Sequence, residues 1–435
     1  MRKRKGFSYV QFEWLCRTSS ALSFEQAVRT DGRMNHATPA RFHISQAGAG
    51  APPAIAEIAR LGDAAASSLR AQLPPPHQLL RACVIIPAKD EAASLPATLA
   101  ALAVQVDLQG QPWPANALEV IVLANNCHDA TAEVVRTQAR QFPRLQLHVA
   151  ELCLPPAQAH VGRARRLLMD EAGARLEQVG QPAGLILSTD ADTQVAPSWL
   201  AATVAAIAAG AEAVGGRILT LPNEQNVCPT VRRTQLRDAA YHLLRARLES
   251  RLDPDPADPW PRHHQHFGAS LALTARAYRR VGGLPDVRYL EDEALWQALR
   301  RHDVPVRHSP AVRVGTSGRH EGRVEVGLSW QLRQWAALHQ QQAEPLVECP
   351  TQLAGLWRAR RQLRAAWAGL DTLDASTAQG LKVGFSELAA LLRSATTFGQ
   401  LWEDVLTARR VAGEAVTLLP LSLALAGVRL LLARV

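Results

Sequence analysis

The feature that most constrains the fold of this 435-residue chain is the regular alternation of short apolar runs with helical segments. The apolar runs are rich in branched residues and are apolar on both faces, as parallel strands buried between two helix layers are. We expect strands at 81–88, 118–125, 145–150, 184–189 and 213–221, and helices at 94–106, 129–142, 157–178 and 197–210. The sequence therefore predicts an α/β fold with a mostly parallel sheet between helix layers.

The segment LILSTDADTQV (185–195) ends its apolar run in two acids, Asp190 and Asp192. In parallel sheets, ligands collect beyond the carboxyl ends of the strands, where this pair is expected to lie. Two carboxylates one residue apart can share Mg²⁺ or Mn²⁺, which prefer oxygen ligands and bridge to phosphates. Such a pair also occurs by chance on solvated turns, but its place after a buried strand favours a metal–diphosphate site.

Two later segments also carry candidate chemistry. The acids 291–293 open a predicted helix at 289–302, where they either complement the helix dipole or supply a general base for an acceptor hydroxyl. The Gly-rich segment 312–323 places Arg319 and Arg323 to bind a diphosphate and His320 to bind a metal, although a solvated basic loop is an equal alternative. The cluster HHQH (263–266) matches no zinc motif, and we interpret it as a pocket wall near the acceptor.

Composition excludes several classes. The formal charge is +9, but the arginines are dispersed and aromatic residues make up only 5%, which disfavours nucleic-acid binding. Six separated cysteines form no metal pair or disulfide framework, as expected in a reducing cytoplasm. The apolar segment 415–428 is shorter than the roughly 20 residues that span a bilayer, so we expect a packed or interfacial helix. That helix allows a peripheral contact with the cytoplasmic membrane.

Three regions follow from these patterns. Residues 1–78 are expected to be a poorly ordered extension and linker, interrupted by helical periodicity at 54–73. Residues 79–345 contain the predicted α/β domain. Residues 346–435 are predicted to form a C-terminal helical region, because their apolar residues recur at helical spacing.

The motifs in this order resemble the family-two glycosyltransferases of the GT-A fold, over roughly residues 81–345. In that family a Pro-Ala-x-Asn/Asp-Glu turn contacts the nucleobase, and here IIPAKDEAASL assigns this role to Pro87, Ala88 and Glu91. In VLANNCHDAT, Asn125 stands where a base-contacting aspartate is usual. The amide can also contact a base edge, and it leaves the choice between uridine and guanosine open.

The resemblance also assigns roles to later motifs. The stretch GRARRLLMDEA brings Arg165 toward the donor, although a surface arginine is the simpler interpretation. STDADT places Asp190 near the ribose and the metal, and Asp192 on the metal. LEDEALWQAL makes Asp292 the base. The loop TSGRHEGR matches only loosely, with Arg319 and Arg323 on the donor and His320 on the metal.

The implied activity is transfer of a sugar from a UDP- or GDP-linked donor to an acceptor hydroxyl on a lipid or small molecule. The resemblance implies inversion at the anomeric carbon, with Mg²⁺ or Mn²⁺ as cofactor. A nucleotidyltransferase would be expected to carry a Gly-rich loop after the first strand, and PAKDEAAS has no glycine. P-loop and nucleophile-elbow motifs are absent. A catalytically silent scaffold is the non-enzyme alternative, disfavoured by the intact acids.

Overall fold

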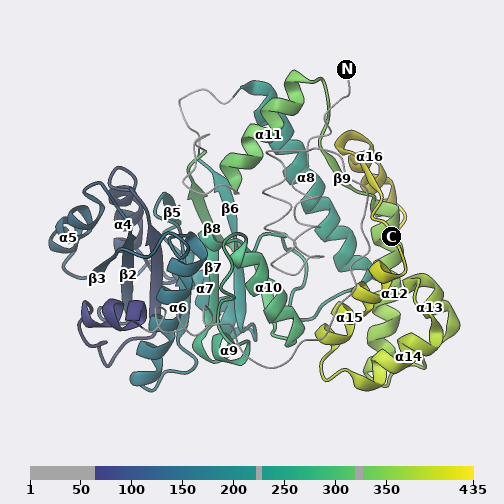
Figure 1. Cartoon of the computed structure of the whole chain (residues 1–435), viewed down its shortest axis with the longest axis horizontal. Helices are drawn as coiled ribbons and strands as arrows, with labels where there is room; N and C mark the ends of the chain where they lie inside the picture. Colours follow the sequence, from purple (N-terminus) through teal and green to yellow (C-terminus); the bar gives the residue numbers. More distant parts are fainter. Residues whose placement is uncertain (1–63, 222–227, 319–326) are drawn as a thin grey trace, which may run out of the picture.

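The computed structural model describes residues 64–221, 228–318 and 327–435 (Figure 1). Eight of the described strands form one sheet. Across that sheet the order is β3 (Gln146–Leu152), β2 (Leu118–Asn125), β1 (Ala82–Ala88), β4 (Leu185–Ser188), β7 (Leu271–Thr274), β6 (Ala213–Thr220), β8 (Val306–Thr316) and β5 (Thr193–Val195). A second, antiparallel pair joins β9 (Leu346–Glu348) to β10 (Leu418–Pro420).

Helices follow most strands, as the alternation predicts. The helices of the α/β part are α4 (Leu95–Ala103), α5 (Thr131–Gln141), α6 (Val161–Gln178), α7 (Trp199–Ala208), α8 (Pro229–Leu252), the 3₁₀ turn η1 (Gly268–Ser270), α9 (Ala275–Arg280), α10 (Glu291–Arg301) and α11 (Leu328–Gln340). Toward the C-terminus follow α12 (Pro350–Trp367), α13 (Ala375–Leu381), α14 (Phe385–Ser394), α15 (Phe398–Val411) and α16 (Leu421–Leu432).

The predicted mostly parallel sheet is confirmed, with two reversals. Strands β1 to β4 run parallel to one another, and β8 runs parallel to β6. Strand β7 runs antiparallel to both of its neighbours, β4 and β6. The short strand β5, antiparallel to β8, was not predicted, because three residues are too few to show a period.

Side chains of the central strands alternate between two cores. Helices cover both faces of the sheet (Figure 1). In β1, Cys83 and Ile85 pack with helices α6, α9 and α10. Their neighbours Val84 and Ile86 pack with α4, α5 and α7. This period of two is that of an extended strand, and it explains why the run is apolar on both faces.

One predicted helix cap differs in detail. Ser94 is the N-cap residue of α4, but its side chain makes no capping hydrogen bond. Pro96 occupies the first turn, and proline has no N–H to donate to a cap.

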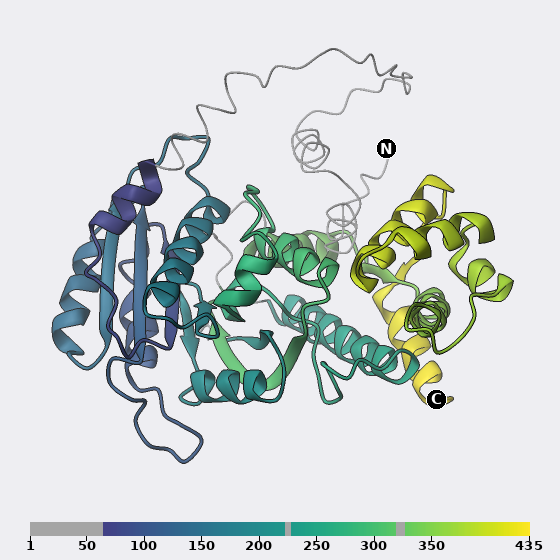
Figure 2. The same ribbon diagram turned by 90° about the horizontal axis from the view of Figure 1, so that it is seen from below.

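The C-terminal region is helical, as predicted, and lies at the end of the molecule away from β1–β3 (Figure 2). It shares a core with the α/β part: Tyr241 and Leu248 of α8 pack with Trp357 of α12 and Leu425 of α16. Strand β9 begins at Leu346. No helix in the three described ranges is long and apolar enough to cross a bilayer.

The N-terminal extension enters the described structure at residue 64. Residues 64–71 are helical, which agrees with the periodicity at 54–73, and the rest of that prediction lies outside the described residues. Leu69 is fully buried in the same core as α6. The last part of the predicted linker is therefore packed against the sheet.

Candidate functional site

Two loops meet at the carboxyl ends of β1 and β2. The Glu91 N–H donates to Thr131 Oγ1 at 2.9 Å, and the Ala92 N–H donates to Asp129 Oδ2 at 3.0 Å. In the other direction, the His128 N–H donates to Asp90 Oδ1 at 2.6 Å. These bonds fix the turn after Pro87 and Ala88 against the loop that follows β2.

A group of three possible metal ligands, Asp90, Cys127 and Asp129, lies within this junction. Each carboxylate already accepts backbone N–H bonds, and Cys127 Sγ accepts from the Asp90 N–H at 3.3 Å. The bond from His128 lowers the pKa of Asp90. We interpret this group as the contact that holds the two loops together, because both of its carboxylates already accept hydrogen bonds from backbone N–H groups.

Asn125 is the last residue of β2 and is 6% exposed. Its Oδ1 atom is buried and has no hydrogen-bond partner among the described residues. A buried amide oxygen without a partner costs free energy unless a ligand or water donates to it. The position therefore presents a hydrogen-bond acceptor at the sheet rim.

The acids Asp190 and Asp192 follow β4 at the same rim. The chain turns there, since the Thr193 N–H donates to the Asp190 carbonyl oxygen at 3.1 Å. The side chain of Asp190 is 37% exposed, and Asp192 is half-buried. The pair thus lies where a solvent-borne ligand can reach it.

Arg165 of α6 connects the acidic pair to the acidic helix start. Its guanidinium donates to Asp190 Oδ1 at 2.6 Å and also to Glu291 Oε1. The side chain of Arg165 is only 4% exposed. Gly268 makes this position possible, because a Cβ on that residue would lie 2.2 Å from Arg165 Nη1.

Helix α10 begins beside this arginine. Leu290, which precedes it, has the left-handed φ of 54° and provides no side-chain cap. Asp292 Oδ2 accepts from the Gly268 N–H at 2.9 Å, and its Oδ1 accepts from the Glu293 N–H at 2.9 Å. The carboxylate is therefore held in one orientation by two backbone donors.

The flanking acids of α10 are buried and paired. Glu291 bonds Arg165, and Glu293 Oε2 lies 2.8 Å from His266 Nε2. Both acids are 4% exposed. Complementing the helix dipole therefore does not account for them, since each has a specific partner on another element.

Electrostatics couple these carboxylates. Burial raises the pKa of Asp190; Arg165 opposes this, while Asp292 and Glu91 reinforce it. Burial, also opposed by Arg165 and reinforced by Asp292, raises the pKa of Glu291 to about 7. Several acids thus share one rim with a single buried guanidinium between them, so the rim as described is electronegative.

Residues 83–264 match the family model for glycosyl transferase family 2. The matched segment is similar in sequence to the family-two glycosyltransferases and spans less than half of the 435 residues. The match includes the loops after β1 and β2 and the acidic pair after β4, and it ends before α10, which carries Asp292. No curated protein sequence gives a significant match.

Several solved structures resemble this chain at low similarity. The mannosyltransferase PcManGT from Pyrobaculum calidifontis, in complex with GDP-Man and Mn²⁺, is 18% identical with a TM-score of 0.40, over 83% of this chain and 97% of that one. TarS from S. aureus, in complex with UDP-GlcNAc, is 14% identical with a TM-score of 0.40, over 77% and 93%. Glucosyl-3-phosphoglycerate synthase from M. tuberculosis is 17% identical with a TM-score of 0.34, over 66% and 84%. These scores are too low to transfer a function.

The structure brings Asp190 and Glu291 together on Arg165, and Asp292 follows Glu291 at the start of α10. The predicted donor and metal residues Arg319, His320 and Arg323 lie outside the described residues. Sequence reasoning missed Gly268, and it did not foresee that His266 pairs with Glu293. The histidine cluster at 263–266 and the acids at 291–293 were both candidates in the sequence, but no local pattern shows that they pair.

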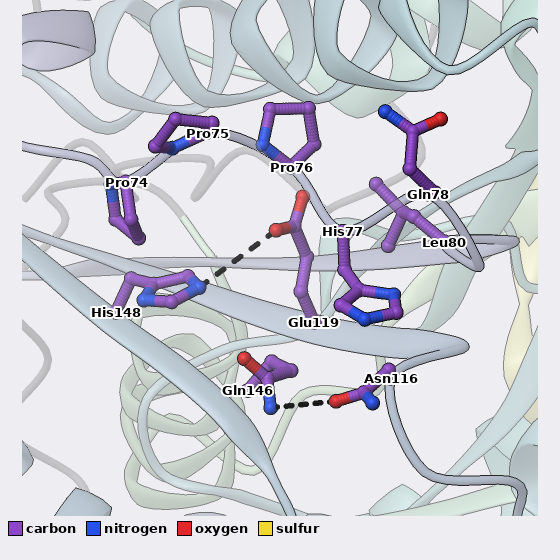
Figure 3. Close-up of a pocket in the computed structure, with 10 residues that line it drawn as sticks. All are labelled: Pro74, Pro75, Pro76, His77, Gln78, Leu80, Asn116, Glu119, Gln146 and His148. Atoms are coloured by element: carbon purple, nitrogen blue, oxygen red, sulfur yellow. Dashed lines mark hydrogen bonds and ion pairs between the residues drawn. The ribbon is translucent and has the colours of Figure 1, made fainter.

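A separate cavity of about 320 Å³ lies at the other end of the strands, where β2 and β3 begin (Figure 3). The proline segment Pro74–Pro76 covers it, and Glu119 and His148 face each other across it at 3.8 Å. Arg175 holds Glu119 through two bonds of 2.8 and 2.7 Å. This cavity is not part of the candidate site described above, because that site lies at the carboxyl ends of these strands.

Proposed function

We propose that this protein transfers a sugar from a nucleotide-diphosphate donor to an acceptor hydroxyl, with a divalent cation and with inversion at the anomeric carbon. The observation that carries the proposal is the pair of contacts from Arg165, which join Asp190 of the donor motif to Glu291 beside Asp292. A metal-and-donor motif and a base are thereby held in one place.

The nucleotide is proposed to bind against the joined loops after β1 and β2. Pro87, Ala88 and Glu91 would form the turn that contacts the base, and Asn125 Oδ1 would accept from a base N–H. Both uracil and guanine have such a donor on the ring, so this contact suits a UDP- or a GDP-linked sugar.

The donor set at the rim fits a hard divalent cation. Asp190 and Asp192 offer carboxylate oxygens. Burial, reinforced by Asp292 and Glu91, raises the pKa of Asp190, and a bound cation would favour the charged form of this carboxylate. Asp190 and Asp192 would hold Mg²⁺ or Mn²⁺, with His320 as a further candidate ligand. Bound there, the ion would supply positive charge to the departing diphosphate.

Asp292 is the proposed general base. Its two backbone contacts orient the carboxylate, which would take the proton of the acceptor hydroxyl. The acceptor oxygen then forms a bond to the anomeric carbon as the bond to the diphosphate oxygen breaks. Attack from the face opposite the leaving group inverts the configuration.

Arg165 is proposed to position Asp190 and Glu291 rather than to contact the donor directly. Its buried guanidinium is used by these two carboxylates. Arg319 and Arg323 remain the proposed donor-binding arginines.

The nucleotidyltransferase alternative is disfavoured, because the loop after β1 has no glycine to cradle phosphates. A thermal-shift screen of nucleotide sugars with and without Mn²⁺ tests the proposal. GDP-mannose and UDP-N-acetylglucosamine are suitable first donors. Stabilisation by one nucleotide sugar that requires the metal is the expected result, and indifference to every nucleotide contradicts it.

Peripheral membrane contact is proposed through α16 at the cytoplasmic face. Leu423 and Leu430, seven residues apart on one helix face, are 59% and 63% exposed. Arg429 and Arg434 are exposed nearby. Co-sedimentation with anionic vesicles should therefore be lost in a Leu423→Asp, Leu430→Asp variant. Equal sedimentation of both proteins contradicts this contact.

A further inference from the structure

A second, larger pocket lies between the α/β part and the C-terminal helices. It has a volume of about 530 Å³, and its walls come from α8, α10, the start of β8, α12 and α15. Pockets of this size at the junction of two units are typical binding sites for small molecules. None of the donor residues discussed above lines it.

The charges on its walls cancel. Seven arginines and seven carboxylates line the pocket, and most of the carboxylates are paired. Arg360 bonds Glu249 at 2.7 Å and also Asp253, and Arg262 lies 3.1 Å from Glu249 and 3.4 Å from Asp258. A phosphate would have to compete with these carboxylates for its guanidinium partners, so a neutral ligand fits better.

Three histidines on the inner wall, His263, His264 and His308, have lowered pKa values, which favours their uncharged form. Burial lowers the pKa of His263 to about 3 and also lowers the pKa values of His264 and His308. No group of three metal-ligating atoms is formed here; in the described ranges only the cluster at Asp90 meets that condition. These histidines therefore offer neutral hydrogen-bonding groups rather than charge or a metal site.

Several polar atoms on the walls of this pocket have no hydrogen-bond partner in the described part of the chain. His266 Nε2 is paired with Glu293, and His308 Nδ1 lies 2.7 Å from Asp258, while the second ring nitrogen of each has no partner among the described residues. Asp253 Oδ1 and Arg364 Nε are also without one there. This mixture of acceptors and a donor matches hydroxyl groups, which both donate and accept.

The inner wall is continuous with the proposed base. His266 lines the pocket and bonds Glu293, the residue after Asp292. Two residues beyond His266, the Gly268 N–H holds Asp292 itself. A ligand in this pocket therefore lies against the same loop and helix turn that orient the base.

We propose that this pocket binds the acceptor, and that the acceptor is a neutral polyhydroxylated compound, a saccharide or polyol. The proposal rests on the function proposed above. It narrows the acceptor from any hydroxyl compound to one that carries several hydroxyls and no phosphate on the part held in the pocket.

The test is calorimetry on the full-length protein with glycerol, myo-inositol and maltose, and with inorganic phosphate and glucose 6-phosphate for comparison. Ala415, an exposed wall residue, is replaced by tryptophan to fill the mouth of the pocket. Ala412→Trp is the matched control, since Ala412 is exposed three residues earlier and does not line the pocket. Leu406→Phe, deeper in the wall, serves as a second filling variant, and circular dichroism verifies the fold of each.

We expect at least one neutral compound to bind saturably, with affinity reduced about tenfold or more by Ala415→Trp or Leu406→Phe and unchanged by Ala412→Trp. Nucleotide binding, measured separately with Mn²⁺, should be the same in all four proteins. If the protein binds a saccharide but no nucleotide, the proposed glycosyltransferase function is refuted, and only the binding of a neutral polyhydroxylated ligand in this pocket is supported. The acceptor assignment is overturned if no neutral compound binds up to tens of millimolar, or if only the phosphorylated compounds bind. It is also overturned if Ala415→Trp and Ala412→Trp have the same affinity for the neutral compound.

Discussion

Arg165 Nη2 lies 2.6 Å from Asp190 Oδ1, although the two residues come from different elements, helix α6 and the turn after β4. The same guanidinium bonds Glu291, which is 126 positions further along the chain than Arg165. Removing one partner from such a buried network leaves an uncompensated charge, which lowers the free energy of unfolding by about 3–5 kcal/mol. Arg165 is therefore the residue on which the relative placement of the two acidic motifs depends.

Gly268→Ala tests this dependence without deleting a charge. The new Cβ, 2.2 Å from Arg165 Nη1, must displace the guanidinium, and we expect a stability loss of about 1–3 kcal/mol and a fall in turnover of about tenfold or more. The control is Gly355→Ala in α12, where no atom lies within 4 Å. That variant should be neutral or slightly stabilising in thermal unfolding. Similar behaviour of the two variants would remove Arg165 from this role.

Asp192→Asn and Asp292→Asn should separate binding from chemistry. The first removes a proposed metal ligand, so calorimetry should show nucleotide binding that no longer responds to Mn²⁺. The second should retain metal-dependent binding and lose about 10²–10⁴-fold in turnover, because a general base is missing. Normal turnover of Asp292→Asn would exclude that residue as the base. Metal-dependent binding that survives in Asp192→Asn would exclude the other assignment.

Asn125→Leu replaces a buried amide by an apolar group of similar size. If Asn125 Oδ1 receives a hydrogen bond from the base, nucleotide affinity should fall about 5- to 30-fold, or about 1–2 kcal/mol. The free energy of unfolding should not fall, because this atom has no protein partner to lose among the described residues. Unchanged affinity in calorimetry would place the base elsewhere.

The ion pairs between the α/β part and the C-terminal helices predict sensitivity to acid. Burial alone would raise the pKa of Glu249, but Arg360 and Arg262 outweigh it and hold that pKa far below its ordinary value of 4.5. Below about pH 4.5, Glu249 therefore binds a proton in the unfolded chain but stays ionised in the folded protein. The free energy of unfolding then falls by up to about 1.4 kcal/mol for each pH unit of acidification.

Glu249→Gln should lower the free energy of unfolding at pH 7. It should also make that free energy depend less on pH below about pH 4.5. Chemical denaturation at a series of pH values measures both effects. Glu387→Gln is the control, because Glu387 lies in the first turn of α14 and is exposed. If the loss of stability on acidification is the same in Glu249→Gln as in the unmodified protein, other carboxylates cause it.

The sequence predicted which residues lie at the rim better than how they interact. Asp190 and Asn125 were placed correctly at the ends of strands, because an apolar run that stops at a polar residue shows where a strand ends. The direction of β7 was not predicted, since side-chain period says nothing about which way a strand runs. The contact of Arg165 with Glu291 depends on how α6 packs beside α10, and no local pattern encodes that packing.

The pairing of His266 with Glu293 was beyond prediction for the same reason. The histidine cluster suggested a pocket wall, and the structure places His266 on one, but the partner acid looked like part of a helix cap. Burial distinguishes the two interpretations, and burial is a property of the folded chain.

The hydroxyls of Ser188 and Thr189 donate to the carbonyls of Gly268 and Ala269, beside the ladder that pairs Ser188 with Leu271. A slip of that ladder by one position would carry Gly268 roughly 3.4 Å along the sheet. Its N–H would leave Asp292, and the space that admits the guanidinium would close. Strand pairing thus sets the distance between Asp190 and Asp292, and a mutation that loosens β7 should abolish the proposed transfer activity under conditions in which the protein is still folded.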